Sequence, residues 1–105
     1  MEYRIHERTV TLMISGELDH HTLRSISKEL GQIIDIYLPK RLIFDMSAVR
    51  FMDSSGIALI IKAIRRMTEL SGEVVLRSVP PAPMKIFAMA GISRYVTVEE
   101  GGKAV

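Results

Sequence analysis

FMDSSGI, at residues 51–57, decides how this chain folds, because it joins a short strand to a helix. The apolar run within Arg41–Asp45 is typical of a buried strand. The helix is expected to begin near Ser54 or Ser55, with Asp53 able to cap it. Both hydroxyls then lie at the positive end of a helix dipole, where backbone N–H groups would stabilise a phosphate on either serine.

The rest of the sequence alternates between strand and helix patterns. Further strands are expected at Tyr3–His6, Thr9–Ile14, Glu73–Val79 and Tyr95–Val98, and helices at Thr22–Tyr37, from Ser54 or Ser55 to about Ser71, and at Met84–Ala90. This alternation predicts an α/β fold with helices packed on one mixed, mainly parallel sheet, in which the first two strands form an edge hairpin. Since no repeat or linker interrupts it, residues 1–105 are expected to form a single domain.

Composition excludes several classes of protein. The 105 residues include no cysteine, so disulfides and thiol chemistry are ruled out. Fourteen basic and twelve acidic residues leave a net charge of +2, and the basic residues are dispersed, so direct binding of nucleic acid is not expected. The longest apolar run, Ile57–Ile61, is too short to cross a bilayer, and the charged N-terminus is not a signal peptide. We therefore expect a cytoplasmic protein without membrane insertion.

Three aspartates, Asp19, Asp45 and Asp53, follow expected strands. Because the carboxyl ends of parallel strands gather at one edge of a sheet, their oxygens would suit a hard metal ion. We favour the alternative, in which Asp19 and Asp53 cap helices and Asp45 accepts from loop amides. No metal and no cofactor are expected, since neither GxxxxGK[ST] nor GxGxxG occurs. The serines lack the GxSxG elbow of hydrolases, so no enzyme activity is expected.

Three segments together resemble the STAS domain of bacterial anti-sigma factor antagonists. They are GELDHHT at Gly16–Thr22, FDMSAVRFMDSSGIALI at Phe44–Ile60 and FAMAGI at Phe87–Ile92. The resemblance covers nearly the whole chain and is greatest to the sporulation antagonists that act on the forespore sigma factor. In that family the first serine after the aspartate is phosphorylated, and here that residue is Ser54.

The resemblance implies a transcription regulator that works by partner switching. The unphosphorylated protein would bind an anti-sigma factor that is also a serine kinase, and the sigma factor would be released. Phosphorylation of Ser54 would end this binding, and a membrane-associated serine phosphatase of the PP2C type would regenerate the active form. The partner-binding residues are expected to be Asp19, Met52, Asp53, Ser55, Gly56 and Ile57.

Two alternatives stay open at this point. One is a STAS scaffold or a stressosome-type interaction module, and the other is a small metal-dependent phosphatase that uses Asp45 and Asp53. Two features also depart from the family pattern. The sequence GGKAV at residues 101–105 leaves little room for the family's C-terminal helix, so the chain is shortened or the helix is lost. The basic helix face within Lys62–Arg66 leaves the identity of the kinase and the sigma factor open.

Overall fold

The computed structural model describes residues 1–100, and the expectation about GGKAV lies outside this part of the chain. Five strands form one sheet in the order β1-β2-β3-β4-β5. They are β1 (Glu2–His6), β2 (Thr9–Leu18), β3 (Arg41–Met52), β4 (Glu73–Arg77) and β5 (Thr97–Glu99). The helices are α1 (His20–Tyr37), α2 (Ser55–Glu69) and α3 (Pro81–Met89), with a short 3-10 helix at Ile92–Arg94. Strand β1 runs antiparallel to β2 and the other neighbours are parallel, so the expected α/β fold is confirmed.

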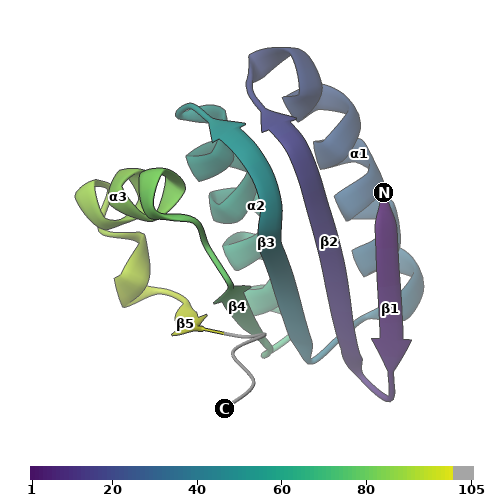
Figure 1. Ribbon diagram of the computed structural model, residues 1–105. Coiled ribbons are helices and arrows are strands. Elements are labelled where there is room, and N and C mark those ends of the chain that lie inside the picture. The colour runs from purple at the N-terminus through teal and green to yellow at the C-terminus, as the bar shows by residue number, and fades with distance from the viewer. Residues whose placement is uncertain (101–105) are drawn as a thin grey trace.

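Helices α1 and α2 cover one face of the sheet, and α3 lies beside β3 (Figure 1). The core fills the layer between the sheet and this helix pair. Leu12, Phe44 and Leu76, from three neighbouring strands, are fully buried there together with Leu30 and Ile60 from the helices. Burial of each such side chain contributes about 1.5–3 kcal/mol to folding, so this apolar layer sets where the strands and helices lie.

The long strands β2 and β3 extend further than expected. The strands expected from sequence ended at Ile14 and Asp45, whereas they reach Leu18 and Met52. The register between them shifts twice within Met13–Glu17, and each shift moves the side chains out of strict alternation. A strand predicted from alternating apolar and polar residues ends where the alternation breaks, although β2 and β3 stay paired beyond that point.

Other boundaries differ by two or three residues. Helix α1 begins at His20 and not at Thr22, α3 begins at Pro81 and not at Met84, and β5 begins at Thr97 and not at Tyr95. Helix α3 can begin at Pro81 because proline lacks a backbone N–H, and N–H groups in the first turn of a helix have no acceptor within the helix. Within residues 1–100, no helix combines the length and the apolar character needed to span a membrane.

Basic side chains connect the two large helices. Lys62 Nζ on α2 donates to the backbone oxygen and the hydroxyl of Ser27 on α1, both at 2.8 Å. Arg66 contacts Asp35 on α1 at 2.6 Å. Of the three basic residues of this face, Arg65 is exposed. The basic face of α2 therefore serves in large part to hold α2 against α1.

Candidate functional site at the turn after β3

Two helix-starting turns meet at one end of the sheet. Leu18 at the end of β2 pairs with Met52 at the end of β3, and the Asp53 N–H donates to the Leu18 carbonyl at 3.2 Å. Asp19 and Asp53 follow these paired residues directly, so the two turns lie next to each other. Figure 1 shows α1 and α2 starting from this same end.

Asp19 caps helix α1, as the sequence predicted. Its carboxylate accepts the backbone N–H of His21 at 3.0 Å and that of Thr22 at 3.1 Å. The Thr22 hydroxyl in turn accepts the Asp19 N–H at 3.1 Å, which completes a capping box. Because a cap of this kind contributes about 0.5–2 kcal/mol, the start of α1 is held firmly beside the second turn.

Asp53 precedes helix α2 but is not its N-cap, in contrast to the prediction, because Ser54 occupies that position. The Asp53 carboxylate accepts the Ser55 N–H at 2.7 Å. Hydrogen bonds from Ser55, first from its N–H and then from its hydroxyl, hold the pKa of the Asp53 carboxyl below its ordinary value. The charge and the backbone N–H of His20 act in the same direction, while desolvation opposes them. Asp53 is therefore an ionised group that binds the start of α2 and lies beside the start of α1.

The two serines have different environments. Ser54 is exposed, and its side chain makes no capping hydrogen bond to α2. Its backbone carbonyl accepts the N–H groups of Ile57 and Ala58, at 3.0 and 3.3 Å, so its backbone is fixed. Ser55 is 8% exposed and is held by Asp53. Only the Ser54 hydroxyl is placed where an external group could reach it.

Met52 and Gly56 lie beneath the surface, in contrast to the direct contact expected of them. Met52 is 5% exposed. A Cβ added to Gly56 would overlap the Met52 sulfur and lie 2.5 Å from its Cγ, so the missing side chain of Gly56 makes room for Met52. Ile57 is half-buried against the core. These residues pack between the turn and the core.

Phe51 is the apolar residue at the surface that sequence analysis missed. It is 51% exposed and pairs with Glu17, whereas its neighbour Met52 pairs with the buried Leu18. The sequence carried one usable signal, since neighbours in a strand face opposite sides of the sheet. That signal was hidden because the strand was expected to end before this residue.

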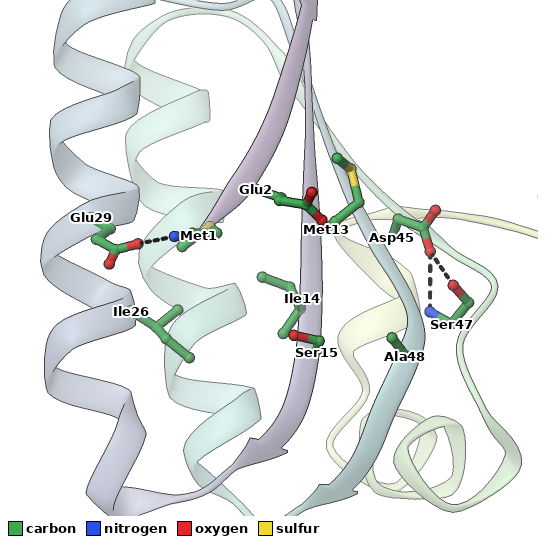
Figure 2. A pocket seen from close by; sticks show the side chains of 10 residues that line it. All are labelled: Met1, Glu2, Met13, Ile14, Ser15, Ile26, Glu29, Asp45, Ser47 and Ala48. Carbon is green, nitrogen blue, oxygen red and sulfur yellow. Dashed lines mark hydrogen bonds and ion pairs between the residues drawn. The ribbon is translucent and has the colours of Figure 1, made fainter.

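Asp45 does not join the other two aspartates. It lies inside β3, where its carboxylate accepts the N–H of Ser47 at 3.1 Å and the hydroxyl of Ser47 at 2.8 Å. Contacts to loop amides were expected, but Ser47 belongs to the same strand, because β3 continues past Asp45 to Met52. Figure 2 shows it beside a cavity of about 340 Å³ between β2, β3 and α1. Within residues 1–100, no three His, Asp or Glu side chains gather as a metal site. The three aspartates therefore serve separate local structures.

The lowered pKa of Asp53 predicts a pH-dependent contribution to stability. A carboxyl whose pKa is lower in the folded state stabilises the fold above the unfolded-state pKa, and this contribution is lost as pH falls through the folded-state pKa. We expect Asp53→Asn to lower the melting temperature at neutral pH, and the difference from wild type to shrink below about pH 4. Thermal unfolding followed by circular dichroism measures both. An equal difference at both pH values would contradict the role given to the charge.

Comparison with known proteins adds to this geometry. The family model for the STAS domain matches residues 1–101. An anti-sigma F factor antagonist of Lysinibacillus sphaericus is 28% identical over 88 residues, which are 84% of this chain and 75% of that protein. The structure of the anti-sigma factor antagonist SpoIIAA in its unphosphorylated form matches with a TM-score of 0.81 and 26% identity, over 92% of this chain and 85% of that one. The phosphorylated form of the Bacillus cell fate determinant SpoIIAA matches with a TM-score of 0.73 and 26% identity, over 92% and 88%.

Proposed function

Because this chain belongs to the STAS domain family, we propose that it is an anti-sigma factor antagonist controlled by phosphorylation of Ser54. The observation that carries the proposal is the contrast between the two serines, since Ser54 is exposed while Ser55 is buried and bonded to Asp53. Similarity to SpoIIAA, an antagonist whose structure is known in an unphosphorylated and in a phosphorylated form, supports a switch of this kind.

In the unphosphorylated state, the surface of the turn would bind an anti-sigma factor. Asp53 and Ile57 reach that surface in part. Ser55 fixes the turn through its hydrogen bond to Asp53, and Asp19 caps the adjacent start of α1. Met52 and Gly56 contribute by packing under it. Binding of the antagonist to the anti-sigma factor would release the sigma factor. Our candidate is sigma F, because two relatives are named anti-sigma F factor antagonists.

A phosphate on Ser54 would change the charge of this surface. The group carries about two negative charges and would lie next to the ionised Asp53, with Asp19 in the adjacent turn. Docking against a partner would remove water from these like charges, which raises their repulsion. The kinase would be the anti-sigma factor itself, and a serine phosphatase of the PP2C type would restore the active form. We place this cycle in the cytoplasm.

The decisive experiment uses the anti-sigma factor kinase and the sigma factor from the same genome. Adding the purified protein to their complex in the presence of ADP is expected to release the sigma factor. Incubation with ATP should then end the release and place one phosphate on Ser54, detected by mass spectrometry of peptides. Ser55→Ala is the matched control and should still accept the phosphate. Failure to release the sigma factor, or phosphate mainly on Ser55 or Thr22, would contradict the proposal.

A further inference from the structure

Strand β1 offers a free edge at the side of the sheet. All five of its residues are exposed, and within the described chain it pairs with β2 alone. Figure 1 shows β1 as the outermost strand, at the opposite edge from β5. The outer N–H and C=O groups of such a strand form a template for another strand, which proteins usually pair or block.

An apolar patch lies along this edge on the side of α1. We call it the edge patch, and it consists of Tyr3, Ile5, Tyr37 and Leu38, which are 37–46% exposed. The rings of Tyr3 and Tyr37 lie 5.9 Å apart, with their hydroxyls 3.3 Å apart. Arg8 donates to the Leu38 carbonyl at 2.6 Å and so ties the end of α1 to the turn after β1. The patch is thus held in shape before anything binds to it.

The opposite side of β1 carries charge. Glu2, Arg4 and His6 pair with Met13, Thr11 and Thr9, whereas Tyr3 pairs with the buried Leu12. The charged side chains therefore project from the sheet face away from the helices, and the tyrosine projects toward them. Residues Glu2–Arg4 follow the order acidic, aromatic, basic. When two copies of this segment run antiparallel, each acidic residue lies opposite a basic one.

We propose that the edge patch binds a second copy of this chain, by antiparallel pairing of the two β1 strands about a two-fold axis at Tyr3. Glu2 of each copy then lies opposite Arg4 of the other, which gives two equivalent ion pairs. The two Tyr3 side chains meet on the helix side, each beside its own Tyr37. The two sheets join into one continuous sheet with an isologous interface.

Charge selects this register over its neighbours. Directly opposite residues must face the same side of the sheet, so a two-fold axis passes through a residue of β1. An axis at Arg4 would set the two Arg4 side chains against each other, and an axis at Ile5 would set Arg4 opposite His6, without an acidic partner. Like charges directly opposite destabilise a strand pair, whereas opposite charges stabilise it. Only the axis at Tyr3 pairs every Glu2 with an Arg4.

The proposed dimer leaves the phosphorylation site free. The Ser54 turn follows β3, and β2 lies between β3 and β1 in the sheet. Both copies could therefore engage an anti-sigma factor at the same time. This inference rests on β1 and α1 alone and does not depend on the proposed function.

Exchange of the two charges tests the pairing. Sedimentation equilibrium of the full chain over a range of concentrations should show a monomer–dimer equilibrium for the wild type. Glu2→Arg or Arg4→Glu alone replaces two attractive pairs with two repulsive ones and should raise the dimer Kd about tenfold or more. The double variant restores both pairs with reversed direction, and its Kd should return close to the wild-type value. Circular dichroism confirms that each variant is folded.

Control variants distinguish loss of the β1 pairing from a general effect of changed net charge on the dimer Kd. Arg65→Glu makes the same charge change on an exposed part of α2 and should leave the dimer Kd unchanged. Tyr3→Lys, which buries two charges at the axis, should yield monomers. A wild type that stays monomeric at all concentrations, single variants that dimerise as the wild type does, or a double variant as weak as the single ones would each overturn the proposal.

Discussion

Phosphorylation of Ser54 is expected to weaken binding to the anti-sigma factor kinase by about a hundredfold or more, which corresponds to about 2.8 kcal/mol. The phosphate would bring about two negative charges to a turn where Asp53 is already ionised and Asp19 lies in the neighbouring turn. Since docking removes water, this repulsion acts with less screening in the complex than in the free protein. Isothermal titration calorimetry with the kinase in ADP measures the loss.

Substitutions at Ser54 separate charge from shape. Ser54→Ala should bind as tightly as the unphosphorylated wild type and act as a permanently active antagonist, because the hydroxyl makes no capping bond that the variant would lose. Ser54→Asp should bind more weakly, although one carboxylate imitates a phosphate dianion poorly. Thr68→Asp adds the same charge at the exposed far end of α2 and serves as the control. Equal affinities of Ser54→Ala and Ser54→Asp would leave charge repulsion without support.

Gly56→Ala is expected to destabilise the fold. Alanine favours a helix over glycine by about 1 kcal/mol, but here its Cβ would overlap the buried Met52 side chain, and overpacking of this kind typically costs about 1–3 kcal/mol. We expect the cost of overlap to exceed the helical gain, so the melting temperature should fall by several degrees. Phosphorylation per folded molecule should stay close to normal, because Gly56 lies beneath the surface.

Two further variants make the test of Gly56 specific. Gly31→Ala, within α1, is the matched control, since its Cβ would lie 3.5 Å from Lys62 Nζ in ordinary contact, and it should raise the melting temperature. Gly56→Ala combined with Met52→Ala should lose less stability than the sum of the two single changes, because the clash is removed. If Gly56→Ala instead keeps its stability and loses kinase binding, close approach by the partner is the reason for the glycine.

Much of the site followed from short-range patterns. Asp19 and Asp53 were expected to cap helices. Asp19 is the N-cap of α1, whereas the N-cap of α2 is Ser54, and Asp53 accepts the Ser55 N–H from one residue earlier. Capping depends on residues two or three positions apart, so local sequence is enough to predict it. The loop amides expected around Asp45 were wrong, because β3 continues past it and its partner Ser47 lies in the same strand.

The tertiary structure decided which side chains of the turn reach the surface. The exposure of Ser54 and Phe51 and the burial of Ser55 and Met52 depend on the register of β3 with β2, which is 34 residues away at the pair Leu18 and Met52. Two register shifts in that pairing set which side of the sheet each residue faces, and no local pattern encodes them.

By itself, the sequence determined the order of strands and helices, the cap of α1 and the family resemblance, because each depends on neighbouring residues. Only the tertiary structure showed that Gly56 makes room for Met52, that Lys62 reaches Ser27 and that β1 leaves a patterned edge open. These features depend on which distant segments pack together. That choice is made by burial of the whole apolar core and not by any single stretch of the chain.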